Sequence, residues 1–199
     1  MRQGFGLGAV KRKLIIVAIS AMIIMPATAA SFSEIKRLAE RGDAVAQVGI
    51  AGMYGLGEGV KQDYAKAMEW ALKAAEQNNA TAQVIIGDFY EYGHGVRQDY
   101  TKAMEWYLKA ATQNHPESQS KAGYLYVSGL GVRQDYAKAM EWYLKAAAQN
   151  HAEAQYNIGV LYIKGHSVRQ DFKIAKEWFG KACDNGSQEG CDKYKLLNR

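Results

Sequence analysis

One stretch decides the fold: Val132-Arg-Gln-Asp-Tyr-Ala-Lys-Ala-Met-Glu-Trp142. Two further copies, Val96–Trp106 and Val60–Trp70, each differ from it at one position and follow a period of 36 residues, and Val168–Trp178 is a looser copy. A fixed period of this length indicates stacked copies of one supersecondary unit, which together present an extended binding surface. The repeat therefore favours a binding or scaffold protein over an enzyme built around one pocket.

Each repeat predicts two helices joined by a glycine-rich linker. In the third repeat the first helix is expected over 116–126, because Pro116 suits the first helical position. Gly129 and Gly131 should end it, and Asp135 stands where the N-cap of a second helix over 136–147 belongs. The same N-cap column holds Asp63, Asp99 and Asp171, and Asn114 and Asn150 should end second helices.

Two columns of the repeat describe how the helices pack. The first helix has a nearly bare position, filled by Ala51, Gly87, Gly123 and Gly159, which predicts a close helix crossing. The second helix places apolar residues at three- and four-residue steps, so one of its faces should be buried. On the solvated face, Glu and Lys four apart predict ion pairs at Glu69/Lys73, Glu105/Lys109, Glu141/Lys145 and Glu177/Lys181. The recurring Tyr and Trp residues are expected in the core.

The first thirty residues have the order of a secretory signal. Lys11-Arg12-Lys13 precedes the apolar run Leu14–Met25, and Pro26-Ala-Thr-Ala-Ala30 supplies a small-residue cleavage site. The run is shorter than the roughly 20 residues a membrane-spanning helix needs. We expect cleavage after Ala29 or Ala30, no membrane insertion afterwards, and a periplasmic or secreted protein. An uncleaved anchor is the alternative.

The leader accounts for most of the net charge. The full chain has 25 Lys and Arg against 20 Asp and Glu, a formal net charge of +5. The leader holds four of the basic residues and no acid, which leaves 21 against 20 and a net charge of +1. A nucleic-acid-binding protein needs a concentrated basic face, so nucleic acid is disfavoured as a partner.

The chain has two cysteines, Cys183 and Cys191. An even number in an exported protein favours a disulfide, and two free thiols are the alternative. A disulfide here would hold the last helix, which has no following neighbour and would otherwise fray.

The repeat resembles the Sel-1-like repeat, a relative of the tetratricopeptide repeat. The shared pattern is small-x-x-x-x-Gly-x-x-Tyr, a Gly-x-Gly-Val linker, Asp, then Lys-Ala-x-x-Trp-x-x-Lys-Ala. It gives four full repeats over 43–186, a partial repeat over 31–42 and a capping helix over 187–199. The resemblance implies an all-α superhelical solenoid whose first helices line the concave side of a protein-assembly scaffold. Ser167 departs from the glycine of the other linkers, which leaves that loop's geometry open.

The cysteine spacing is similar to that of the cysteine-rich secreted Sel-1-like proteins, although only the last junction carries it. Some of those proteins bind penicillin or are weak β-lactamases, and Ser118-Gln-Ser-Lys121 matches the Ser-x-x-Lys motif of penicillin-recognising enzymes. However, Ser118 occupies a packing column and no companion motif is present. A binder or hydrolase of β-lactams or cell-wall peptides is therefore the alternative function. We predict no catalytic residue, metal or cofactor.

Two further sets of polar residues are candidate sites. The histidines His94, His115, His151 and His166 are too widely spaced along the repeats for one zinc ion and are expected at the surface or as caps. A basic column precedes each Gln-Asp pair and could meet an acidic partner, although we expect the adjacent Asp column to neutralise it. It contains Lys61, Arg97, Arg133 and Arg169.

Specificity is expected in the first helices, because their sequences differ between repeats while the second helices are copied. Drift on an unconstrained surface would also produce this contrast. The varying positions predict an apolar and aromatic groove with few charges, and tyrosines of this kind are favoured in interfaces. The groove would bind a peptide or helix of another exported or envelope protein. Its predicted residues are Asp88, Tyr92, Ser120, Lys121, Tyr124, Tyr156, Asn157, Val160 and Lys164.

Overall fold

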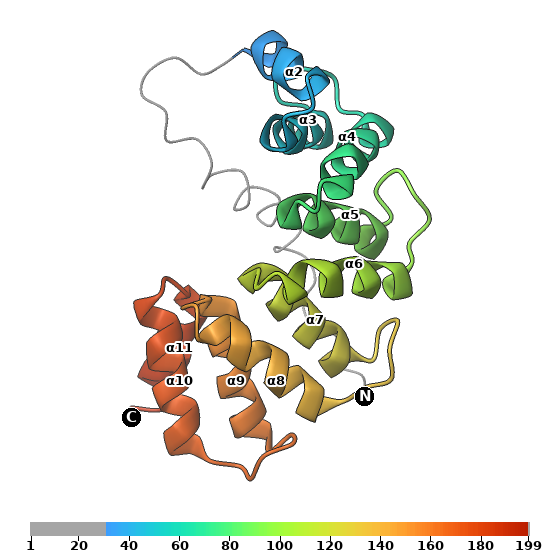
Figure 1. Ribbon diagram of the computed structural model, residues 1–199. Helices are drawn as coiled ribbons and strands as arrows, with labels where there is room; N and C mark the ends of the chain where they lie inside the picture. The colour runs from blue at the N-terminus through green and yellow to red at the C-terminus, as the bar shows by residue number, and fades with distance from the viewer. Residues whose placement is uncertain (1–30, 199) are drawn as a thin grey trace. The chain divides into compact units, whose positions relative to one another are not determined.

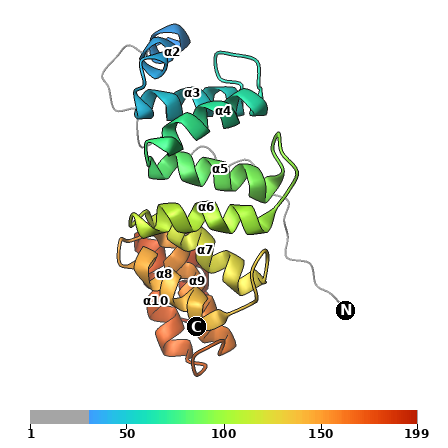
Figure 2. The same ribbon diagram turned by 45° about the vertical axis from the view of Figure 1, so that its right-hand side comes forward.

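The computed structural model describes residues 31–198, and all regular structure within them is α-helical (Figures 1 and 2). This confirms the predicted all-α repeat fold. The predicted leader, residues 1–30, lies outside the described residues. No helix among those described is long and apolar enough to span a bilayer. The helices are α2 (Phe32–Glu40), α3 (Ala44–Leu56), α4 (Tyr64–Glu76), α5 (Ala80–Tyr92), α6 (Tyr100–Thr112), α7 (Pro116–Ser128), α8 (Tyr136–Ala147), α9 (Ala152–Lys164), α10 (Phe172–Asp184) and α11 (Gln188–Leu196).

The chain forms two compact units that meet between Ala82 and Gln83, within α5. In the first unit α3 is a first helix and α4 a second helix. In the second unit α5, α7, α9 and α11 are first helices, and α6, α8 and α10 are second helices. The predicted first and second helices are therefore confirmed in each repeat.

The helix ends follow the predicted caps. Asp99 Oδ1 accepts a hydrogen bond from Lys102 N at 3.0 Å, and Asp135 Oδ1 accepts from Ala137 N and Lys138 N at 3.0 Å each. Asn114 and Asn150 adopt positive φ angles of 64° and 61° in the turns that follow α6 and α8, as expected for residues that end a helix.

The fourth linker keeps the geometry of the others despite its serine. Ser167 has a φ of 60°, close to the 69° of Gly131 at the equivalent position. Its Oγ donates a hydrogen bond to the carbonyl oxygen of Tyr136 at 3.1 Å. This hydrogen bond to the preceding repeat holds the linker in a backbone conformation that residues with a side chain rarely adopt.

The second helix of each repeat crosses the first helix at the position that holds glycine or alanine. A Cβ atom on Gly123 would lie 2.7 Å from the ring of Tyr143, and one on Gly159 would lie 2.7 Å from the ring of Phe179. Neither aromatic side chain is more than 2 % exposed. The predicted close crossing is therefore confirmed, and its cause is an aromatic ring lying on the glycine.

Buried glutamines connect each first helix to the second helices around it. Gln119 Nε2 donates to the carbonyl oxygen of Ala111 in the preceding second helix, and Gln119 Oε1 accepts from Gln149 Nε2 at 3.0 Å. Gln155 repeats this with the carbonyl oxygen of Ala147 and with Asn185. These bonds satisfy polar groups that burial would otherwise leave unpaired.

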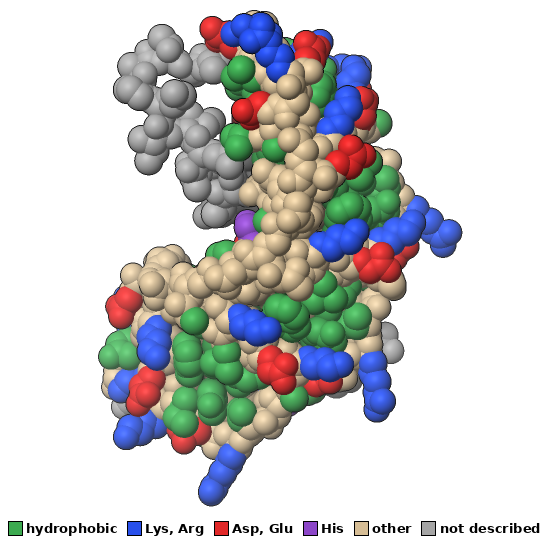
Figure 3. All heavy atoms as spheres, in the orientation of Figure 1, with side chains coloured by type: hydrophobic (Ala, Val, Ile, Leu, Met, Phe, Trp, Pro, Cys, Tyr) green, Lys and Arg blue, Asp and Glu red, His purple; other side chains and the backbone are tan. Residues whose placement is uncertain are grey.

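The predicted Glu–Lys ion pairs form only in part. Lys73 lies 2.8 Å from Glu69, but Lys109, Lys145 and Lys181 pair with no acid within 4.0 Å in the described chain. Each of these three lysines instead lies over a Trp ring, 3.9–4.2 Å from its centroid. The prediction was wrong for these three repeats. The ring contact alone does not account for the difference, because Lys73 lies 4.1 Å from the centroid of the Trp70 ring and still pairs with Glu69. In Figure 3, Lys and Arg side chains lie beside hydrophobic ones on the visible surface.

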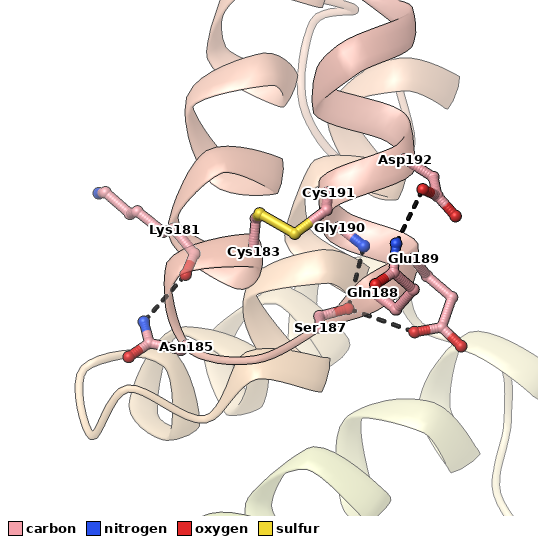
Figure 4. The surroundings of a disulfide bond; sticks show 9 residues. All are labelled: Lys181, Cys183, Asn185, Ser187, Gln188, Glu189, Gly190, Cys191 and Asp192. Carbon is pink, nitrogen blue, oxygen red and sulfur yellow. Dashed lines mark hydrogen bonds between the residues drawn. A yellow bond between two sulfur atoms is a disulfide. The ribbon is translucent and has the colours of Figure 1, made fainter.

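The last junction replaces a glutamine bond with a disulfide. Cys183 and Cys191 are joined, with their Cα atoms 4.5 Å apart, and they link α10 to α11 (Figure 4). Cys191 occupies the glutamine column and Cys183 the column of the carbonyl that the glutamine binds elsewhere. The predicted disulfide is confirmed, and it holds the same two positions that a hydrogen bond holds in earlier repeats.

Removing the disulfide should destabilise α11. Closing so short a loop contributes about 2–3 kcal/mol to the free energy of unfolding. We expect Cys183→Ser/Cys191→Ser to lose that amount and to speed amide hydrogen exchange in α11. In Cys183→Ala/Cys191→Gln, which restores the side-chain pattern of the other repeats, part of the protection should return. Unchanged exchange in the double serine variant would contradict the capping role.

Candidate functional site

The first helices of the second unit carry the predicted groove residues, which the structure separates into accessible and buried ones. Tyr124 is 43 % exposed, and Lys164 is also exposed. Ser120 is 2 % exposed, so its prediction as a groove residue was wrong. Its column faces the core, as Val84 does one repeat earlier. Tyr92, Tyr156, Asn157 and Val160 are partly buried. Together with Tyr124, Lys164 and the half-buried Glu117, these four residues form a surface that we call the first-helix face.

A buried charged cluster lies beneath this face, at the junction of α5, α6 and α7. Lys121 Nζ is 3.0 Å from Asp88 Oδ1, and each side chain is only 11 % exposed. The hydroxyl of Tyr107 lies 2.6 Å from Asp88 Oδ1 and 2.5 Å from Glu91 Oε2. The cluster therefore connects two helices of one repeat to the first helix of the next.

One phenol faces two carboxyl groups in this cluster. Tyr107 has a single hydroxyl proton, so it cannot donate to both carboxyl groups. Burial raises the pKa of Glu91, and the nearby charge of Lys121 offsets part of that rise. Although burial alone would lower it, the nearby Asp88 and Glu91 raise the pKa of Lys121 well above its usual range.

The predicted groove with few charges therefore lies above a buried charged cluster, which the prediction did not include. Asp88 and Lys121 were predicted as groove residues, whereas Glu91 was not. A signal for the cluster was present, because each of its charged residues stands in a column that is uncharged in the other repeats. Position 91 is Gly, Val and Ile elsewhere, position 88 is Gly, Tyr and Val, and position 121 is Gly, Ile and Asn.

The Ser-x-x-Lys match serves packing in this structure. Ser118 has no exposed surface, and its Oγ donates to the carbonyl oxygen of His115 at 2.8 Å. Lys121 is held by Asp88. A hydroxyl without exposed surface cannot reach a substrate, so these residues do not form an accessible nucleophile.

Two histidines cap first helices, as predicted for capping residues. His115 Nδ1 accepts from Ser118 N, and His151 Nδ1 accepts from Ala154 N at 3.3 Å. Burial lowers the pKa of both rings, that of His151 to about 4. Among the described residues, no group of three or more His, Cys, Asp or Glu side chains is arranged to hold a metal ion.

The basic column on the linkers is not neutralised as predicted. Asp99 Oδ2 lies 4.0 Å from Lys102 Nζ, and Asp135 caps its own helix. Arg97, Arg133 and Arg169 are exposed and have no acidic partner within 4.0 Å in residues 83–198. The Asp side chains turn to the backbone N–H groups of the helix that follows, which are closer and more rigid than a flexible guanidinium.

Comparison with known families agrees with the repeat geometry. The sequence pattern described as the Sel1 repeat matches residues 43–79, 80–115, 116–151 and 152–187. The chain belongs to the Sel1 repeat family. Sel1 repeats generally act as scaffolds for protein–protein interaction and are typically non-catalytic. The comparison with curated proteins gave no match.

Three solved structures are similar to the chain. The first is c5321, a protective antigen of uropathogenic Escherichia coli with an SLR fold, at 34 % sequence identity and a TM-score of 0.80. The match covers 85 % of this chain but only 36 % of that protein's chain. The second is a Sel1 repeat protein from Oxalobacter formigenes, at 30 % identity, TM-score 0.74 and 82 % and 74 % coverage of the two chains. The third is Helicobacter pylori cysteine rich protein B, at 28 % identity, TM-score 0.52 and 68 % and 98 % coverage.

The capping histidine should make stability depend on pH. The pKa of His151 falls to about 4 in the folded protein, whereas an unfolded histidine titrates near 6.5. The folded state therefore excludes a proton that the unfolded state binds, and stability is lost as pH falls from about 6.5 through about 4. Asn caps a helix equally well without titrating.

We expect His151→Asn to lose less stability than the wild type on acidification, by on the order of 1 kcal/mol between pH 7.5 and pH 5. Urea unfolding at both pH values measures the difference. Parallel losses in the two proteins would show that His151 does not contribute.

Proposed function

We propose that this chain is an exported scaffold that binds a peptide or helical segment of another envelope or secreted protein on its first-helix face. The observation that carries the proposal is Tyr124, a large aromatic residue left 43 % exposed on a helix whose packing residues are buried. Aromatic residues with a polar end are favoured as interface anchors. Around Tyr124 the face offers partly buried Tyr92, Asn157 and Val160 rather than a continuous row of charges.

The buried cluster supports this role by fixing the helices beneath the face. Lys121 of α7 is tied to Asp88 of α5, and Tyr107 of α6 contacts the same carboxylate. A binding surface held rigid before the partner arrives loses less conformational entropy on binding. The α5–α7 spacing is thus set without contribution from the partner.

Export is supported by the sequence of the leader and by the cysteines. Residues 11–30 carry basic, apolar and small-residue segments in the order of a secretory signal. The only two cysteines of the chain form a disulfide, which persists in oxidising compartments such as the periplasm. The alternative, a binder or hydrolase of β-lactams or cell-wall peptides, has less support because Ser118 is buried.

Site-specific cross-linking tests the proposal in cells that make the full chain. A photo-reactive amino acid at position 124 should capture a defined partner from the envelope or the medium, and the same group at position 144 should not. Leu144 is a matched control because it is 44 % exposed and lies on the second helix α8. N-terminal sequencing of the scaffold protein itself should show that it begins at Ala30 or Ser31.

With the partner in hand, Tyr124→Ala should weaken its binding by at least about tenfold, because anchor residues contribute about 2 kcal/mol or more. Leu144→Ala should leave binding unchanged, and both variants should keep the helical circular dichroism of the wild type. Equal cross-linking from both positions, or full binding by Tyr124→Ala, would reject the first-helix face.

A further inference from the structure

We propose that the linkers of the second unit form a separate docking surface for an acidic segment of a partner polypeptide. This linker edge consists of the α5–α6, α7–α8 and α9–α10 linkers, each of which carries one arginine of the ladder Arg97, Arg133 and Arg169. In Figure 3, Lys and Arg side chains stand out from the surface at the three places where Figure 1 draws these linkers. The proposal does not depend on the first-helix face.

The guanidinium groups of the ladder do not stabilise the fold through polar contacts within the described chain. None of the three arginines forms an ion pair or hydrogen bond with another residue of the described chain, although aspartates stand two positions further on. Those aspartates are committed to helix caps, as Asp135 is to the N–H groups of Ala137 and Lys138. The fold itself therefore needs no positive charge at these positions.

A cleft opens beside the central arginine. It has a volume of about 630 Å³ and combines two cations with an aromatic wall. Lys138 Nζ lies 5.5 Å from the ring centroid of Tyr126 and has no acid within 4.0 Å, in contrast to Lys102 in the preceding repeat. The amide of Gln134 is satisfied by the carbonyl oxygen of Val127 at 2.7 Å. The lining residues are Tyr126, Val132, Arg133, Gln134, Asp135 and Lys138.

The chemistry of this edge selects carboxylates. A guanidinium presents paired N–H donors that match the two oxygens of a carboxylate, and the ammonium of Lys138 can complete the pocket around a single acidic side chain. Because the arginines recur once per repeat, an extended segment with several Asp or Glu residues can contact more than one of them. Electrostatic attraction of this kind speeds association and sets the register of the partner.

A polypeptide fits better than a nucleic acid. Residues 31–199 have a net charge of only +1, since 21 basic residues face 20 acidic ones once the leader is excluded. Asp135 lies in the cleft itself and would repel a closely spaced row of phosphates. A flexible peptide can place its carboxylates at the arginines and leave uncharged residues beside the aspartates.

The test uses a labelled peptide of alternating Glu and Ser residues and the mature protein at low ionic strength. Fluorescence anisotropy should show binding that weakens as salt is added. We expect Arg97→Gln/Arg133→Gln/Arg169→Gln to weaken binding by about tenfold or more, because each lost contact is exposed and modest but the three act together. The exposed arginine side chains make no ion pair or hydrogen bond within the described chain, so the variant should melt as the wild type does.

A matched variant controls for net charge. Lys109→Gln/Lys145→Gln/Lys181→Gln removes the same charge from the second helices and should change binding by less than about twofold. Tyr124→Ala should bind the peptide as the wild type does, which separates this surface from the first-helix face. Absence of binding, or equal losses in both triple variants, would overturn the proposal. Tighter, arginine-dependent binding of duplex DNA or of anionic lipid vesicles would overturn the choice of a polypeptide.

Discussion

An aromatic ring lying on a glycine is the contact on which the rest of this structure depends. In three successive repeats the second helix places Tyr107, Tyr143 or Phe179 where a Cβ atom of the first helix would be. The first repeat shows the same constraint from the other side. Its two corresponding positions are Ala51 and Ala71, both fully buried. In this repeat Ala71 replaces the aromatic residue of the second helix and Ala51 replaces the glycine of the first helix. The smaller side chain on one helix thus leaves room for a methyl group on the other.

This division of volume separates stacking from recognition. The ring, the glycine and the buried glutamines lie in columns that face the interior, so side chains on the outer face of the first helices can change without disturbing the crossing. Tyr107 adds a second use to the ring position, because its hydroxyl gathers Asp88 and Glu91 beneath the first-helix face. In the next repeat the columns of Asp88 and Glu91 hold Tyr124 and Val127, and in the last repeat Phe179 has no hydroxyl at all. The charged cluster is therefore a local addition to a general packing rule.

The sequence predicts those features that are set within one repeat. Helix limits, the Asp135 cap, Asn150 and the Gly123 crossing all depend on neighbours a few residues away or on one column, and all are found. The sequence predicts poorly which of several nearby groups a charged side chain will contact. Lys145 had both Glu141 and Trp142 within reach and lies over the ring. Arg133 had Asp135 within reach, but the carboxylate caps the helix. Lys121 and Asp88 belong to different repeats, and only the stacking geometry brings them together.

A double-mutant cycle at one crossing measures the central contact most directly. Urea unfolding would give the free energies of the wild type, Gly123→Ala, Tyr143→Ala and the double variant. In the Tyr143 background Gly123→Ala should cost about 1–3 kcal/mol, because the new methyl group meets the ring. In the Tyr143→Ala background the same substitution should cost nothing, or stabilise by up to about 1 kcal/mol, as expected for Gly to Ala in a helix. An equal cost in both backgrounds would contradict the account.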